Sequence, residues 1–373
     1  MPNTPEPHEE DLDSLTMPRP VFYAEQALLG ALLLEPRRLA DLAGIEPDAF
    51  STAAHRALFT AIRNLPAPDA TEHARTTAWL DQVLTTAQEN IRGLSAPYLH
   101  TLIQGCPRPQ HASTYAQMVA TEHARRTLRT EAQRLAQTAR DFSHPHPALA
   151  SLAAADTLTD AVDRLAATFP SGPASLPRTP PPNPPPAHDA EEAAEEERAL
   201  LAAVTANPAT IDQMRWLTDQ DFLHPLNAGL WHATSALARR RAAVDPITIL
   251  WEAQHQGLLT TGTDPERLLQ ALGAPAAGDP HYWGERILHR SLLTTAQHVA
   301  RQIEDLTDDP ATTPQQLLLG SRRALAGLNS VRARWHQATS PAPAPPRPAR
   351  TSPVRPRAGP PRTTAPSPSR VSR

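Results

Sequence analysis

The basic side chains of this sequence decide which nucleotide chemistry it can support. The 373 residues include 35 that are lysine or arginine, and every one of these is arginine. A P-loop that hydrolyses a nucleoside triphosphate needs a lysine that reaches the terminal phosphates. The nearest glycine-spaced stretch, GSRRALAG at 320–327, fits an amphipathic helix instead. The sequence therefore excludes a P-loop motor in this chain.

Histidine and cysteine form no recognisable catalytic or metal-binding pattern. Sixteen histidines are present, but only His144 and His146 lie close together, and two ligands without a third bind a metal weakly. Cys106, the single cysteine, lies between Gly105 and Pro107 without an evident base, which favours a structural thiol and fits a reducing compartment. We predict no catalytic residue, no metal and no cofactor.

Several basic residues could bind a partner instead. His55 and Arg56 open a predicted helix, where local capping or a salt bridge is favoured over a partner contact. An arginine-bearing helix face and an arginine-rich end supply further candidates. The partner-contact candidates on the helix face are Arg125, Arg126 and Arg129, and the phosphate-contact candidates at the end are Arg347, Arg350, Arg355, Arg357 and Arg362. This end lacks interleaved aromatic residues, so a plain disordered tail is an equal alternative.

Proline placement divides the chain into segments. The stretch PSGPASLPRTPPPNPPP at 170–186 can form neither helix nor sheet and predicts a semi-rigid spacer. The divisions that we expect are a disordered N-terminus (1–16), a first helical domain (17–169), a proline-rich linker (170–190), a second helical domain (191–335) and a disordered basic tail (336–373). The formal net charge of −4 indicates neither nucleic acid nor membrane as a partner.

The pattern between these segments is helical. Leucines in AEQALLGALLL (24–34) occupy positions all round a helix, which predicts a central helix of a bundle that Pro36 ends. Ser51 and Thr52 are candidate caps for the next helix, and a long helix is expected at 111–140. The acidic run at 191–197 suits a solvated helix start.

An internal repeat appears at an offset of 172 residues. EQALLGALLLEP (25–36) aligns with ERALLAAVTANP (197–208), and nine residues are identical over positions 25 to 62. The same offset pairs Phe50 with Phe222 and Phe59 with Trp231. Similar helix composition alone does not keep the proline and the aromatic residues in one register. We therefore expect two copies of one bundle.

The motifs of the first copy, PRPVFYAEQALLGALLLEP, PDAF and HRALF, resemble the N-terminal domain of DnaB-type replicative helicases. The second copy has Asn227 and Ala228 in place of His55 and Arg56, but its Asp245-Pro-Ile-Thr248 is similar to another family segment. The resemblance covers residues 18–142 and 195–305. The first-copy residues on the family's positions are Ala24, Glu25, Gln26, Leu29, Gly30, Phe50, His55, Arg56 and Phe59; the second copy keeps Glu197, Leu201, Pro208, Asp221, Phe222 and Trp231.

The resemblance implies an all-α fold in which each copy is a small bundle followed by a helical hairpin. In the family this domain packs helicase subunits together and binds primase, and ATP is hydrolysed elsewhere. We therefore expect a non-enzymatic, cytoplasmic interaction protein of DNA replication, with the replicative helicase, the primase or another copy of itself as partner. Two alternatives stay open: a non-specific DNA-binding accessory protein, and a degenerate helicase relative that joins mixed assemblies. No membrane partner is expected.

Overall fold

The computed structural model describes residues 19–42, 44–169, 187–259, 262–275 and 278–340, and every regular element in these ranges is a helix. The all-α class predicted from the sequence is confirmed. Helix α9 (Ala187–Ala206) begins inside the predicted linker, and α14 (Pro314–Thr339) continues beyond the predicted start of the tail. The predicted N-terminal segment, the stretch 170–186 and the tail from residue 341 lie outside the described residues.

The first copy opens with a bundle around a central apolar helix, α2 (Pro20–Leu34). Leu28, Leu29, Leu32 and Leu33 have no exposed surface, as the all-round leucine pattern predicts. These leucines form one core with Phe50 and the helices that follow. The other bundle elements are η1 (Pro36–Asp41), η2 (Pro47–Ala49), α3 (Ala53–Asn64), α4 (Ala70–His73), α5 (Ala78–Asn90), α6 (Ala96–Gln104) and η3 (Pro109–His111).

Helix boundaries in this bundle follow local chemistry. Proline occupies the first turn of α2 and α6, where its missing N–H has no helical partner to lose. The Thr52 hydroxyl accepts a hydrogen bond from the His55 amide at 3.1 Å, which makes Thr52 the cap of α3. Gly30 lies where α2 and α6 cross, and a Cβ on it would come within 2.1 Å of the Leu102 carbonyl oxygen. Only glycine permits that approach.

The second copy repeats the bundle with α9 as its central helix. Glu197, Leu201 and Phe222 take the places of Glu25, Leu29 and Phe50, and all three are buried. The rings of Phe222 and Trp231 lie 5.7 Å apart, as those of Phe50 and Phe59 lie 4.8 Å apart. The other bundle elements are η4 (Pro208–Gln213), η5 (Asp219–Asp221), α10 (Pro225–Arg239), α11 (Pro246–His255) and α12 (Pro265–Leu272).

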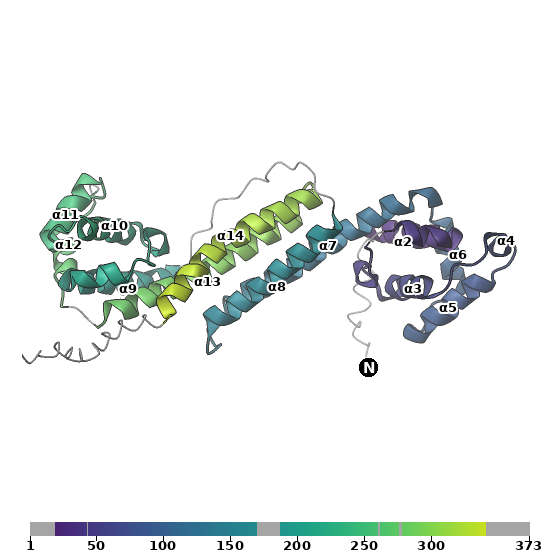
Figure 1. The fold of residues 1–373 in the computed structure, drawn as a ribbon, viewed down its shortest axis with the longest axis horizontal. Helices are drawn as coiled ribbons and strands as arrows, with labels where there is room; N and C mark the ends of the chain where they lie inside the picture. Colours follow the sequence, from purple (N-terminus) through teal and green to yellow (C-terminus); the bar gives the residue numbers. More distant parts are fainter. Residues whose placement is uncertain (1–18, 43, 170–186, 260–261, 276–277, 341–373) are drawn as a thin grey trace, which may run out of the picture. The chain divides into compact units, whose positions relative to one another are not determined.

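Each bundle is followed by two long helices, α7 (Ala112–Thr138) with α8 (Pro147–Thr168), and α13 (Pro280–Asp308) with α14 (Figure 1). The helices α7 and α13 pack against each other in opposite directions. Arg125 of α7 binds Asp309, which directly follows α13. Ala139, which directly follows α7, binds Gln297, an earlier residue of α13. The hairpins of the two copies are therefore joined directly.

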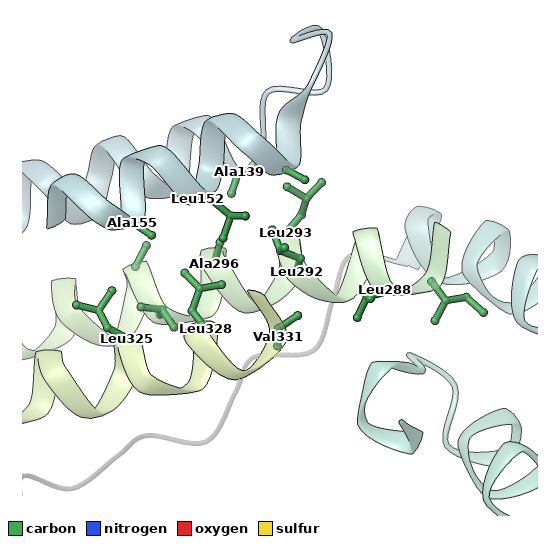
Figure 2. Close-up of a cluster of buried hydrophobic side chains, with 14 of the residues drawn as sticks. Ala139, Leu152, Ala155, Leu288, Leu292, Leu293, Ala296, Leu325, Leu328 and Val331 are labelled. Carbon is green, nitrogen blue, oxygen red and sulfur yellow. The ribbon is translucent and has the colours of Figure 1, made fainter. Parts of the chain in front are cut away.

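The hydrophobic core does not divide at the proline-rich linker. Figure 2 shows Ala139 and Leu152 of the first copy facing Leu292, Ala296 and side chains of α14 in the second copy. The first bundle and the start of α7 have a separate core, whereas the rest of α7, the other three long helices and the second bundle share the other one. The two sequence copies are thus linked by burial of apolar surface as well as by the chain.

Within the described part of the chain, no helix has both the length and the apolar character that crossing a lipid bilayer would require.

Candidate interaction surfaces

A buried polar network ties together three elements of the first bundle. The Glu25 carboxylate accepts hydrogen bonds from the Ser51 amide (2.8 Å), the Ser51 hydroxyl (2.9 Å) and Nδ1 of His55 (2.7 Å). Nε2 of His55 lies 2.8 Å from the Tyr98 hydroxyl. When Nδ1–H donates to the carboxylate, Nε2 can accept a hydrogen bond from the Tyr98 hydroxyl. Burial raises the pKa of Tyr98, and the charge of Glu25 raises it further.

The second bundle contains an equivalent buried network around Glu197, whose hydrogen bonds with the described residues include no histidine or tyrosine side chain. Glu197 accepts hydrogen bonds from the amides of Leu223 (2.6 Å) and His224 (3.3 Å) and from the side-chain amide of Asn227 (2.9 Å). Leu223 and Asn227 are the repeat equivalents of Ser51 and His55. Burial raises the pKa of Glu197, although these hydrogen bonds and the charge of Arg290 act in the opposite direction. In both copies the glutamate binds amides at the start of a neighbouring helix.

These contacts settle where His55 and Arg56 lie. The His55 side chain has no exposed surface and is a member of the core network. Arg56 is exposed on the next position of α3. Glu25 binds the amide and the hydroxyl of Ser51, the residue before the Thr52 cap of α3.

The three arginines on α7 are engaged within the chain. Arg125 donates to the carbonyl oxygens of Thr307 (3.2 Å), Asp309 (2.8 Å) and Pro310 (3.3 Å), and also to that of Thr312. One guanidinium thus binds four carbonyl groups at the end of α13 and in the following turn, and the carbonyl oxygen of Asp309 also accepts a hydrogen bond from the Thr312 amide at 3.1 Å.

Its two neighbours on α7 are also occupied. Arg129 forms an ion pair with Asp308, at the end of α13. Arg126 donates to the Ala49 carbonyl oxygen at 2.6 Å, and its guanidinium lies 3.9 Å from Glu25. The arginines predicted from sequence to contact a separate partner therefore fasten the first copy to itself and to the second copy.

Two further ion pairs join α8 to α14. Arg322 lies 2.8 Å from Asp163, and Arg332 binds both carboxylate oxygens of Asp156. The hydrogen bond from Arg332 lowers the pKa of Asp156. Neither pair was predicted, because the partners are far apart in sequence and each side chain by itself looks like a solvated surface group.

Acidic residues at the start of α9 depart in part from the sequence prediction. Glu191, Glu192 and Glu195 are exposed, as a solvated helix start requires, but Glu196 and Glu197 are buried. The prediction is wrong for these two because they face the bundle. Glu196 compensates its burial by pairing with Arg286 and Arg290 of α13.

Asp221, which the sequence resemblance places on a family position, is a second buried carboxylate whose contacts were not predicted. It accepts hydrogen bonds from the Ser291 hydroxyl (2.7 Å) and the Thr218 amide (2.8 Å), and it pairs with Arg334 of α14. The available signal was its position beside Phe222, where the repeat aligns it with Ala49. Both Ala49 and Asp221 are arginine contacts, of Arg126 and Arg334 respectively.

The single cysteine and the close histidine pair lie in different parts of the described fold. Cys106 is a buried free thiol, and burial raises its pKa, which disfavours the nucleophilic thiolate. His144 accepts a hydrogen bond from the His146 amide in the exposed turn between α7 and α8. Three or more metal-ligating side chains do not gather anywhere in that part of the chain.

A surface hollow of about 550 Å³ lies between the end of α2 and helices α4 and α5. Its walls include the apolar side chains of Leu33, Leu80 and Ile103 and the basic side chain of Arg38. Arg38 is paired with Glu35 at 2.6 Å. Nε2 of His73, another residue of its wall, lies 2.9 Å from the Leu33 carbonyl oxygen. The predicted phosphate contacts Arg347, Arg350, Arg355, Arg357 and Arg362 lie outside the described residues.

Comparison with known proteins agrees with the repeat. The model of the DnaB-like helicase N-terminal domain matches residues 17–121 and residues 189–279. Each match ends close to the start of a long helix, so it spans one bundle, and the two matches together cover more than half of the chain. No solved structure matches the chain.

Proposed function

Because this chain belongs to the DnaB-like helicase N-terminal domain family, we propose that it is a replication-associated protein that binds other proteins through helical surfaces and drives no reaction. Two copies of the family's domain are present, and the resemblance assigns that domain to subunit packing and primase binding rather than to ATP hydrolysis. The absence of lysine supports a chain without a P-loop motor. We expect it to act in the cytoplasm.

The observation that carries this proposal is the pairing of the two hairpins inside one chain. Arg125 and Arg129 of the first copy hold the end of α13 in the second, and the apolar faces of α7, α8, α13 and α14 share one core. The chain thus presents two bundles on one preassembled support. Such a support suits an adaptor that docks its bundles onto a replicative helicase or a primase.

The same pairing disfavours the two alternatives. A DNA-binding protein that uses Arg125, Arg126 and Arg129 would have to release these side chains from Thr307, Asp308 and Ala49. A degenerate relative that enters mixed assemblies through its hairpins would have to open a core first. Non-specific DNA attraction through the arginine-rich end remains compatible with the adaptor.

The test is direct binding between purified components. The full chain is mixed with the replicative helicase or with the primase of its host, and complex formation is followed by size-exclusion chromatography and calorimetry. We expect one of the two to bind at micromolar concentration and to remain bound at raised salt. If neither enzyme is retained, the adaptor proposal fails.

Two further measurements separate the alternatives. DNA binding is titrated with salt for the full chain and for a chain ending at residue 340. We expect weak binding that disappears with the tail. Persistent DNA binding by the shortened chain, or ATP hydrolysis by pure protein, would each contradict the proposal.

A further inference from the structure

Helix α11 of the second bundle, labelled in Figure 1, exposes two large apolar side chains. Ile247 and Trp251 lie one helical turn apart and are 63% and 62% exposed. The chain has six tryptophans, all within the described residues, and Trp251 is the only one that is exposed. An exposed tryptophan beside an exposed isoleucine is typical of a protein-binding site, because burial of both apolar side chains in an interface is favourable in free energy.

The internal repeat shows that the fold does not require this face. Helix α5 of the first bundle corresponds to α11, with Trp79 and Val83 buried where Ile249 and Ala253 are buried. In this register, Thr77 and Asp81 stand where the second copy has Ile247 and Trp251. The first copy therefore has polar residues at the two positions where the second copy has apolar residues.

The surroundings of this face are basic. Arg239, Arg240 and Arg241 are exposed at the end of α10, and Arg240 binds Glu252 of α11 at 2.7 Å. This ion pair joins the arginine run to the residue that follows Trp251 in α11, and it balances the charge of Glu252. Arg239 and Arg241 form no ion pair with the described residues.

The other titratable groups at the start and the end of α11 do not pair with Arg239 or Arg241. The Asp245 carboxylate is occupied by the amides of Ile247 and Thr248, which it caps. The ring of His255 lies against that of Trp251, with centroids 4.9 Å apart and the two planes tilted by 56°, and it extends the aromatic surface. The face is thus apolar in its centre and positive at one side.

We propose that α11 is a docking site for an acidic amphipathic helix of another protein. Apolar side chains of that helix pack on Ile247 and Trp251, and its carboxylates lie opposite Arg239 and Arg241. A helix fits because two knobs one turn apart on α11 match apolar side chains spaced by three and four residues on a partner. The inference goes beyond the proposed function, and it does not require the helicase or the primase to be that partner.

The test uses the full chain and three synthetic peptides of sixteen residues. One carries leucine with helical spacing and glutamate elsewhere, the second has the same composition in scrambled order, and the third has arginine in place of glutamate. Calorimetry gives each dissociation constant at low and high salt. We expect the acidic amphipathic peptide to bind at least about tenfold more tightly than either other peptide, and more weakly at high salt.

Variants locate the site. The double variant Ile247→Thr, Trp251→Gln removes the apolar face without adding charge and should weaken binding at least about tenfold. Arg239→Glu with Arg241→Glu should reverse the preference toward the arginine peptide. Phe142→Ala is the matched control, because Phe142 is 70% exposed in the turn between α7 and α8 and should leave binding unchanged. Circular dichroism verifies that each variant keeps its helix content.

Three outcomes would overturn the proposal. The first is unchanged affinity after the Ile247 and Trp251 substitutions, and the second is equal binding of the acidic and arginine peptides. The third is concentration-dependent self-association that requires Trp251, which would assign the face to a second copy of this chain. Binding of the helicase or the primase is measured separately, so either idea can fail without the other.

Discussion

Arg125 and Asp309 are separated by 184 residues, and the Arg125 guanidinium donates to the Asp309 carbonyl oxygen at 2.8 Å. The bond joins the first copy of the repeat to the second. Thr307 and Thr312, whose carbonyl oxygens also accept from Arg125, are only 7% and 5% exposed. A single side chain therefore supplies the donors for a helix end and turn that contribute to the joint between the copies.

Arg125→Ala should destabilise the protein by about 1–3 kcal/mol, because it leaves buried carbonyl groups without a charged donor. Urea unfolding followed by circular dichroism measures this change. Arg56→Ala is the control, because Arg56 is exposed on α3, and its effect should stay within about 0.5 kcal/mol. Equal stability of the two variants would show that Arg125 does not hold the copies together.

Local features of the fold were predictable from the sequence. The leucine pattern of α2, the stop before Pro36 and the cap at Thr52 each depend on residues within one or two turns. The repeat register was predictable for the same reason, because Pro208 and Phe222 keep their spacing from Glu197. Short-range chemistry determines these elements.

The pairing of the copies could not be predicted in this way. Arg125 looks the same in sequence whether it faces solvent, DNA or the end of α13, and only tertiary structure brings Asp309 to it. His55 is a similar case, since its partners Glu25 and Tyr98 lie 30 and 43 residues away. The repeat held one unused signal: His55 aligns with Asn227, and both side chains can donate to the retained glutamate.

His55→Asn should be tolerated better than His55→Leu. Asparagine occupies the equivalent position of the second copy and binds its glutamate at 2.9 Å, so it should lose mainly the Tyr98 hydrogen bond, about 1 kcal/mol. Leucine leaves the buried Glu25 carboxylate and the Tyr98 hydroxyl short of a partner, which should cost about 3 kcal/mol or more. Urea unfolding compares the two variants. Equal losses would mean that ring packing, and not the hydrogen bonds, makes His55 important.

Gly30→Ala should destabilise the first bundle by about 1–3 kcal/mol, because the new methyl group meets the backbone of α6. The added Cβ would lie 2.1 Å from the Leu102 carbonyl oxygen, and backbone at a helix crossing cannot move aside easily. Thermal and urea unfolding both report the loss. The matched control is Gly327→Ala in α14, where an added Cβ meets nothing within 4 Å and should stabilise the helix by about 0.5–1 kcal/mol. A loss of the same size in both variants would point to helix propensity or flexibility instead of the crossing.

Mild acid should weaken the paired hairpins through histidines that are held neutral. Burial lowers the pKa of His289, and the charges of Arg286 and Arg290 lower it further, while Glu196 acts in the opposite direction. Burial also lowers the pKa of His123 on α7 and of His298 on α13, with Arg126 and Arg301 as the next causes.

The native state therefore binds protons at these sites less readily than the unfolded chain, in which histidine titrates near 6.5. Their contribution to stability is complete above that pH and decreases as the pH falls below it. The pKa of Glu197 is raised, so this residue changes stability in the opposite sense at lower pH. The contribution of a histidine is therefore taken as the difference in pH slope between the wild type and its histidine variant. Urea unfolding at about pH 7.5, 6.5 and 5.5 should show a progressive loss, and His289→Gln should flatten part of it. The exposed His100, replaced by glutamine, serves as the control for a histidine substitution at the surface. A slope that His289→Gln does not change would remove His289 from the explanation.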